Sequence, residues 1–221
     1  MKYIVVDLEM NPINKKLHKE KALGTETIEI GAVMLNEEYK EISSFRTYVK
    51  PMYNSVIEPK ITRLTGITND MVNNAPLFQE AFKLFCKWCV ESGDDVAIYA
   101  WSDSDYMQIM SEIDDKEYFL SAGEEKICSS AWIDFQKQFD GRLGFERRVS
   151  LKMALDIAGI DFDGKEHDAL DDARNTAELF HVMNNESLFA ITLQKIAELM
   201  KPKPIGNSLG SLFDFSAFAV A

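Results

Sequence analysis

The chain has 221 residues, with 36 Asp and Glu against 24 Lys and Arg, a formal net charge of −12, and 46% hydrophobic residues. The hydrophobic fraction is ordinary for a globular domain and excludes a disordered chain. The negative net charge argues against a protein that coats nucleic acid by neutralising its phosphates. It leaves open an enzyme that reaches phosphates through bound metal cations, because such a site is itself a cluster of carboxylates.

The cysteines and the apolar runs narrow the class further. Three Cys cannot form a disulfide scaffold, and no Cys–His cluster has the spacing of a zinc site. No run of about 18 apolar residues is present for a membrane span. The first apolar run ends at Asp7, too early for a signal peptide. We therefore expect a cytoplasmic protein without a membrane segment.

The first part of the chain reads as strands. Residues 3–8 form a nearly continuous apolar run, which is typical of a strand buried on both faces. Two β-rich runs follow at 27–35 and 42–49, and the polar turn at 36–38 between them predicts an antiparallel pair. A further buried strand is predicted at 96–101.

Helices are predicted where apolar residues recur at helical spacing. These segments are 59–66, 76–89, 104–113, 131–139, 150–158, 168–184 and 186–200. Three strands followed by helices and a further strand indicate an α/β fold with a mixed sheet. We expect one domain at 1–185, a C-terminal helix at 186–200 packed on it, and a tail at 201–221, where Pro and Gly become frequent.

Carboxylates gather at two of the predicted strands. Asp7 and Glu9 lie two residues apart at the end of the first strand, so both point to the same face. Asp103 and Asp105 follow the 96–101 strand, and ligands bind at the carboxyl ends of strands in open α/β sheets. A solvent-exposed strand end explains the first pair equally well, and ordinary helix N-capping explains the second.

A third acidic segment enters the predicted 168–184 helix. Asp168 is a candidate N-cap, and Asp171 and Asp172 fall in the first turn, where the helix dipole favours negative charge. His167 precedes the helix, and a histidine near fixed acids suits a general base that reaches a water. Helix capping alone accounts for one of the two first-turn aspartates.

Three acidic segments and a histidine suggest hard-cation chemistry. Mg²⁺ and Mn²⁺ prefer oxygen ligands and leave positions open for water and phosphate. Two such ions about 3.5–4 Å apart can hold the attacking and leaving oxygens of an in-line displacement. We therefore expect two divalent cations, Mg²⁺ or Mn²⁺, as cofactors.

These motifs, in this order, resemble the DnaQ-like, DEDDh 3′-to-5′ exonucleases, the group that includes RNase T and the ε-type exonuclease domain of DNA polymerase III. The likeness covers residues 1 to about 185 and includes the blocks GTETIEIGAVML, FRTYVKP, ITRLTGIT and SLKMALDIAGI. It is closest to the branch of exoribonucleases that trim histone-message, ribosomal and small-interfering RNA ends. The resemblance implies a ribonuclease H-like fold, with a mixed five-stranded sheet flanked by helices.

The family's spacing also chooses between neighbouring aspartates. In the second motif, roughly W-G-x-x-D, Ser102 replaces the glycine and the count selects Asp105. In the third motif, the position five residues after His167 selects Asp172. The resemblance implies that four carboxylates bind the two cations, and that His167 takes a proton from the attacking water to release a nucleoside 5′-monophosphate. Those four are Asp7, Glu9, Asp105 and Asp172.

Substrate contacts follow from the same resemblance. In relatives, the residue after the strand glutamate and the L-T-G segment hold the 3′-terminal nucleotide, so Met10, Leu64 and Thr65 are candidate contacts. Core packing explains Met10 and Leu64 equally well. Asn11 departs from the small Thr or Ser often found nearby.

The remaining conspicuous residues have ordinary interpretations. Cys86 and Cys89 read as buried thiols, because no second pair of ligands is present. His18 and His181 read as surface or helix-end residues. A small basic loop is expected to be solvated, with contact to a nucleic-acid backbone as the second interpretation. Its residues are Lys15, Lys16, Lys19 and Lys21.

The expected partner is the 3′ end of single-stranded or short-overhang nucleic acid, with RNA preferred over DNA. One alternative is a DNA-directed exonuclease of the same fold, since sugar discrimination depends on contacts to the 2′-hydroxyl. The other is a catalytically weak nucleic-acid-binding or regulatory module. The sequence leaves the oligomeric state and the role of residues 201–221 open.

Overall fold

The computed structural model describes residues 1–16, 22–54, 56–91, 93 and 95–199. Its centre is one five-stranded sheet in the order β3-β2-β1-β4-β5. The strands are β1 (Lys2–Pro12), β2 (Thr25–Leu35), β3 (Glu41–Tyr48), β4 (Val96–Ala100) and β5 (Ala131–Asp134). The β1–β2 and β2–β3 pairs are antiparallel, whereas β1–β4 and β4–β5 are parallel. The mixed five-stranded sheet is therefore confirmed.

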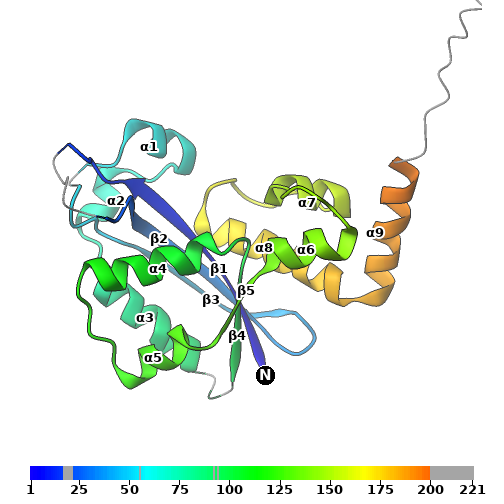
Figure 1. The fold of residues 1–221 in the computed structure, drawn as a ribbon, viewed down its shortest axis with the longest axis horizontal. Helices are drawn as coiled ribbons and strands as arrows, with labels where there is room; N and C mark the ends of the chain where they lie inside the picture. The colour runs from blue at the N-terminus through cyan, green and yellow to red at the C-terminus, as the bar shows by residue number, and fades with distance from the viewer. Residues whose placement is uncertain (17–21, 55, 92, 94, 200–221) are drawn as a thin grey trace, which may run out of the picture.

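Helices cover both faces of this sheet, as Figure 1 shows. They are α1 (Pro59–Thr65), α2 (Asn69–Asn73), α3 (Phe78–Val90), α4 (Ser104–Asp115), α5 (Ala122–Cys128), α6 (Phe135–Leu143), α7 (Leu151–Ala158), α8 (Ala169–Asn184) and α9 (Glu186–Leu199). Helices α3, α4 and α5 share a core with one face, and α6, α7, α8 and α9 share a core with the other.

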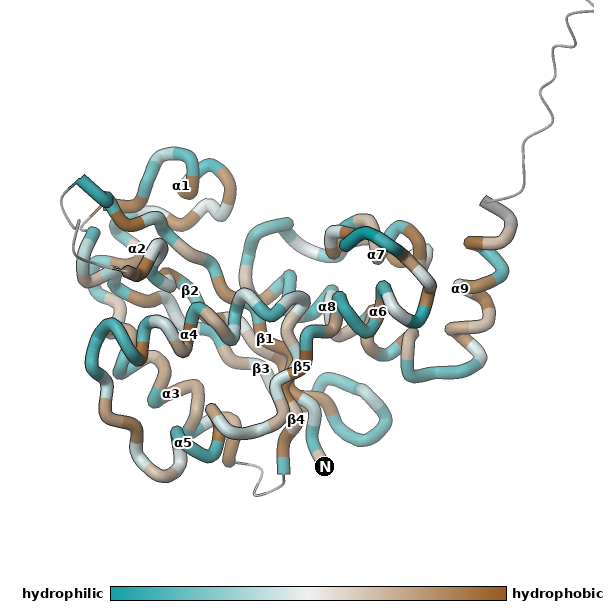
Figure 2. The backbone as a smooth tube through the Cα atoms, viewed as in Figure 1, coloured by the Kyte–Doolittle hydropathy of each residue, from teal (hydrophilic) through white to brown (hydrophobic). Residues whose placement is uncertain are grey.

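Strand β1 supplies both cores. Ile4, Val6 and Leu8 pack on the side of α3 and α4, whereas Val5 packs on the side of α8. Because both faces are covered, the strand reads as a continuous apolar run instead of an alternating one. The tube of Figure 2 is accordingly mostly brown along the central strands.

The helix predicted over residues 131–139 is wrong in its first half. Residues Ala131–Asp134 are strand β5, which pairs with β4, and α6 begins only at Phe135. Asp134 is the N-cap of α6, since its side chain accepts a hydrogen bond from the Lys137 N–H. Pairing with a distant strand overrides the helical spacing here.

Other differences concern lengths and short elements. Strand β1 continues to Pro12, well past the predicted end at residue 8, because β2 pairs with it throughout. Helices α2 and α5 were absent from the prediction, and their five and seven residues are too few to show a period. Ser121 and Glu124 begin α5 with a capping box.

The C-terminal part lies against the second core. Helix α9 packs against α7 and α8, with Phe189 buried among their apolar side chains. Residues 201–221, expected to form a tail, lie outside the described part of the chain. Within the described ranges, no helix combines the length and the apolar character that a membrane crossing requires.

Candidate active site

The site opens where β1 loses one of its neighbours. The parallel partner β4 pairs with β1 only as far as Val6 and then ends. In its place, the N–H of Leu8 donates a hydrogen bond to Asp105 Oδ1 at 3.1 Å. Asp105 lies in the first turn of α4 and is only 5% exposed. On this side, the strand segment that carries Asp7 and Glu9 therefore lies beside the start of α4.

A glycine brings the second helix to the same place. Asp7 pairs across the sheet with Gly31 of β2. A Cβ on Gly31 would lie 2.3 Å from the backbone of Ala169 and Leu170, so only glycine allows α8 to approach the sheet this closely. The first turn of α8, which carries Asp172, is thereby placed over Asp7.

A β-bulge lies beside Glu9. Glu9 pairs with Glu29, whereas the next residue, Met10, pairs with Thr27. The extra residue on β2 bends the ladder at the position where the carboxylates gather, as bulges often do next to functional sites.

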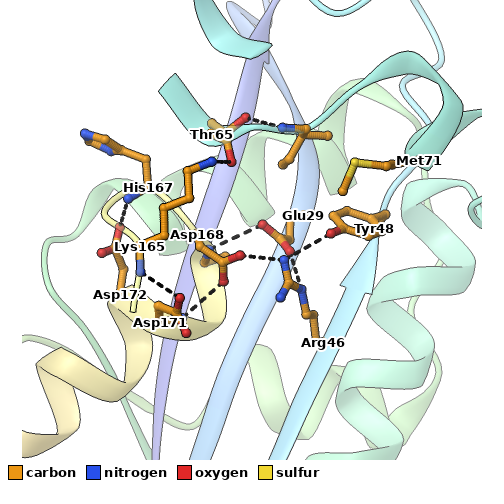
Figure 3. A network of polar contacts seen from close by, with 12 residues as sticks. Glu29, Arg46, Tyr48, Thr65, Met71, Lys165, His167, Asp168, Asp171 and Asp172 are labelled. Atoms are coloured by element: carbon orange, nitrogen blue, oxygen red, sulfur yellow. Dashed lines mark hydrogen bonds and ion pairs between the residues drawn. The ribbon is translucent and has the colours of Figure 1, made fainter. Parts of the chain in front are cut away.

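The loop before α8 is held by the carboxylates of the helix. Asp171 Oδ2 accepts a hydrogen bond from the Lys165 N–H at 2.9 Å, and Asp172 Oδ2 accepts one from the His167 N–H at 3.1 Å (Figure 3). Asp168 caps the helix by accepting from the Asp171 N–H. His167 has a positive φ of 63°, an unusual conformation for a residue with a side chain. These bonds hold it there.

Three of the expected site residues offer ligand atoms to one point. One ligand atom each from Glu9, His167 and Asp172 lies within 4.8 Å of the other two. Asp7 and Asp105 lie close to this group, because repulsion from Asp105, Asp172 and Glu9 contributes to the raised pKa of Asp7. The structure thus brings together all four predicted acids and His167, from β1, α4 and α8.

Burial, together with neighbouring carboxylates, raises the pKa of all four acids. Burial, with repulsion from Asp105 and Asp172, holds the pKa of Asp7 well above its usual range. Burial, with repulsion from Asp172 and Glu29, raises the pKa of Glu9 to about 8. For Asp105 and Asp172, burial is again the largest cause, and each pKa rises to about 7.

This excess of negative charge fits divalent cations. Within the described ranges, no lysine or arginine forms an ion pair with any of the four acids. Buried carboxylates without a cationic partner are costly, and hard cations such as Mg²⁺ and Mn²⁺ bind to clustered carboxylate oxygens. The donor set therefore suits divalent cations.

An ion pair between a partly exposed arginine and a buried glutamate supports the site from the side. Glu29, the cross-strand neighbour of Glu9, accepts hydrogen bonds from Arg46 Nε at 2.6 Å and from the Ala169 N–H at 3.3 Å. Arg46 also bonds to Asp168 at 2.6 Å, so β2, β3 and the start of α8 are tied together. The sequence analysis does not identify the interactions among Glu29, Arg46 and Asp168. A charged residue within the apolar 27–35 run was the available signal, because a buried charge requires a partner.

The three candidate substrate contacts differ in exposure. Leu64 is 42% exposed on α1, whereas Met10 is partly buried and packs against the core on the α3 and α4 side. Thr65 is buried, and its hydroxyl donates to the Ile61 carbonyl and accepts from the Ile67 N–H. Of the three side chains, that of Leu64 is the most accessible to a ligand.

Asn11 has a structural role instead. It is 1% exposed, donates to the Val56 carbonyl at 3.3 Å and accepts from the Glu58 N–H at 2.9 Å. Its side chain therefore holds the loop that leads into α1.

The cysteines and His181 lie where the sequence analysis places them, whereas part of the basic loop lies outside the described residues. Cys86 and Cys89 are buried free thiols, and burial raises the pKa of both. His181 lies in the last turn of α8 beside the ring of Tyr39. His18, Lys19 and Lys21 lie outside the described residues, and Lys15 donates to the Leu23 carbonyl.

Comparison with known proteins gives a family. Residues 4–180 match the RNase T exonuclease family. The chain is 31% identical to ERI1 exoribonuclease 2 of Mus musculus over 94% of this chain and 32% of the relative. It is 29% identical to 3′-5′ exoribonuclease 1 of Rattus norvegicus over 70% of this chain and 45% of the relative. A DNA polymerase III PolC-type protein of Clostridium perfringens is 30% identical over 80% of this chain and 11% of its own length.

Solved structures show the same fold. The nuclease domain of 3′hExo, a DEDDh family member bound to rAMP, matches with a TM-score of 0.69 and 22% identity, over 82% of this chain and 90% of that chain. Cell-death related nuclease 4 matches with a TM-score of 0.67 and 20% identity, over 82% and 63%. The ribonuclease H-like exonuclease fold is thereby confirmed. The chain spans about a third to under half of the two exoribonucleases above.

Proposed function

Because the chain belongs to the RNase T exonuclease family, we propose that it removes nucleotides one at a time from the 3′ ends of single-stranded or overhanging RNA. The observation that carries this proposal is the convergence of Asp7, Glu9, Asp105 and Asp172 beside His167. These residues come from one strand and two helices that are far apart in the sequence.

We propose that the four carboxylates hold two divalent cations, Mg²⁺ or Mn²⁺, which supply charge stabilisation to the phosphate and lower the pKa of water when bound. The residues of the chain then divide the remaining tasks. His167, on the exposed loop, accepts the proton of the attacking water. Its main-chain N–H donates to Asp172, so the loop that carries the imidazole is tied to a proposed metal ligand. The product is a nucleoside 5′-monophosphate.

The 3′-terminal nucleotide is proposed to lie against Met10, Leu64 and Thr65. Leu64 offers an exposed apolar side chain for the base. Thr65 contributes through the backbone of the L-T-G segment, because its hydroxyl is already bonded within the end of α1. RNA is favoured because the two relatives named as exoribonucleases align with most of this chain.

A DNA-directed exonuclease is the second candidate, favoured by the similarity to the PolC-type polymerase. The metal-binding acids do not distinguish the two, since both hydrolyse the same phosphodiester. The ratio of rates on matched RNA and DNA decides between them.

We further propose that the exonuclease domain is 1–185, with the helix at 186–200 packed on it, and that the protein acts in the cytoplasm. The free state of Cys86, Cys89 and Cys128 fits a reducing compartment. Fractionation of cells that express the tagged protein tests the location, and recovery in a secreted or membrane fraction would contradict it.

The function is tested with 5′-labelled RNA and DNA of one sequence in Mg²⁺, Mn²⁺ or EDTA. Asp105→Asn removes a site carboxylate, and Asp114→Asn on the exposed side of the same helix is the matched control. We expect a ladder that shortens from the 3′ end, is faster on RNA, and is lost in EDTA and in Asp105→Asn only. Metal-dependent RNA binding without cleavage would support the binding-module alternative instead.

A further inference from the structure

A lysine joins the loop of the general base to the segment proposed to hold the substrate. Lys165 Nζ donates a hydrogen bond to the Thr65 carbonyl at 2.7 Å, across 100 residues of sequence. In Figure 3 the side chain of Lys165 extends from the loop before α8 to the end of α1. His167 is two residues further along the same loop, and Leu64 precedes the accepting residue.

The accepting end is built for a cation. Thr65 is the last residue of α1, so its carbonyl has no partner within the helix. Ammonium groups are favoured at helix C-termini, where these carbonyls and the helix dipole concentrate negative charge. The C-cap is Gly66, with φ of 79°, and a Cβ there would lie 2.2 Å from Lys165 Nζ. The glycine therefore both ends the helix and leaves room for the ammonium.

The main chain of Lys165 is also held in place. The N–H of Lys165 donates to Asp171, and the preceding Gly164 has φ of 88°. A Cβ on Gly164 would lie 2.3 Å from the Asp171 carboxylate, so another residue there would be strained and would displace the carboxylate that accepts from Lys165. Lys165 is thus fixed to α8 by its main chain and to α1 by its side chain.

We propose that Lys165 is a positioning residue, which sets His167 at a defined distance from the nucleotide held by the Leu64–Thr65 segment. Without the tether, only the bonds to Asp171 and Asp172 hold the loop, so they open more often and the loop loses its reference to the substrate side of the site. We expect the loss of Lys165 to lower kcat and not substrate binding, because the Leu64–Thr65 segment still contacts the nucleotide. The role in catalysis rests on the function proposed above.

The chain contains a matched control elsewhere. Lys195 Nζ donates to the Ala158 carbonyl at 3.3 Å, and Ala158 is the last residue of α7. The C-cap there is Gly159, with φ of 71°, and a Cβ on it would lie 2.1 Å from the ammonium. Lys195 therefore makes the same kind of contact as Lys165, between α9 and the end of α7 and not at the site. Lys195→Met measures the general cost of losing such a contact.

The experiment compares Lys165→Met, Lys165→Arg and Lys195→Met in the full chain with Mg²⁺. We expect Lys165→Met to lower kcat about tenfold with little change in KM, as expected for one lost charged hydrogen bond. Lys165→Arg restores most of the rate, and Lys195→Met keeps it. In a His167→Ala background, Lys165→Met has no further effect, because it acts through the missing imidazole.

Hydrogen exchange of the Lys165 and His167 amides gives a reading that is independent of turnover. Both amides donate to carboxylates of α8, and we expect faster exchange in Lys165→Met but not in Lys195→Met. Unchanged exchange, an equal loss of kcat in Lys195→Met, or the same loss with and without His167 would each overturn the inference. An inactive wild type would contradict the proposed function, while the exchange rates would still decide whether the tether exists.

Discussion

The N–H of Leu8 donates a hydrogen bond to Oδ1 of Asp105 at 3.1 Å, across 97 residues of sequence. The bond stands where β4 would have continued the ladder, since β4 ends opposite Val6. Asp105 therefore satisfies a strand N–H with one oxygen, accepts from the Ser104 hydroxyl with the other, and still acts electrostatically on Asp7. Structural and proposed chemical roles meet in one carboxylate.

Two substitutions at Asp105 separate these roles. Asp105→Asn keeps an oxygen for the Leu8 N–H, whereas Asp105→Ala leaves a buried N–H without a partner, at a cost of about 1–3 kcal/mol. Both variants are expected to lose RNA hydrolysis. Urea unfolding should show Asp105→Ala to be less stable than Asp105→Asn by that amount. Equal stability of the two would show that water replaces the carboxylate oxygen.

The raised pKa values predict how stability depends on pH. For Glu9 the pKa rises to about 8, and for Asp105 and Asp172 to about 7, above their values in the unfolded chain. The folded protein therefore binds more protons than the unfolded chain between about pH 4 and pH 8, and stability falls as pH rises through that window. In EDTA, we therefore expect the melting temperature to decrease as pH rises from about pH 4 to about pH 8.

Two controls accompany this measurement. Asp7→Asn removes one of the repelling charges and should flatten the pH dependence, whereas Asp114→Asn, at an exposed position of α4, should leave it unchanged. Excess Mn²⁺ should restore stability at the higher pH, by about 2.7 kcal/mol at a concentration of 100 times Kd. A melting temperature that rises with pH in EDTA would contradict the assigned electrostatics.

Arg46→Met tests the ion pair beside the site. Glu29 is fully buried and would lose its cationic partner, while Arg46 itself is 37% exposed. We expect a loss of about 2–3 kcal/mol, below the ~3–5 kcal/mol for breaking a fully buried pair. Arg174→Met is the control, since Arg174 and Glu41 are both partly exposed and their pair is worth about 1 kcal/mol or less. Similar losses of stability in Arg46→Met and Arg174→Met would contradict the expectation that the buried Glu29 makes its ion pair the stronger of the two.

His167→Ala separates chemistry from binding. The imidazole is proposed to take a proton, and loss of a general base costs roughly 10²–10⁴-fold in rate. RNA binding in Ca²⁺ should stay near that of the wild type, because the four acids are retained. A variant that keeps full kcat would assign the proton transfer to another group.

Much of the fold was accessible from local sequence. The apolar run of β1 and the antiparallel pair that follows are written in patterns of adjacent residues. Strand β5 is not, because four residues that also suit a helix become a strand only by pairing with β4. Helix α5 is likewise too short to show a period.

For the site, too, local sequence identified only some of the features. Neighbouring aspartates have the same local pattern, so their residues alone left the choice between them open. Their environments differ in three dimensions: Asp103 is 64% exposed and pairs with Arg148, whereas Asp105 is buried against β1. The tether of Lys165 has no sequence signature at all, because its partner is a main-chain carbonyl 100 residues away.

The most direct test uses RNA labelled on its 3′-terminal nucleotide, with wild type and Asp7→Asn compared side by side in Mg²⁺. The account predicts that the wild type releases the label first as a nucleoside 5′-monophosphate, before any shorter oligonucleotide carries it. It also predicts that Asp7→Asn is slower by about 10³-fold or more, since the metal-binding charge is lost. Label that leaves in oligonucleotides, or equal release by the variant, would contradict an exonuclease site built on these acids.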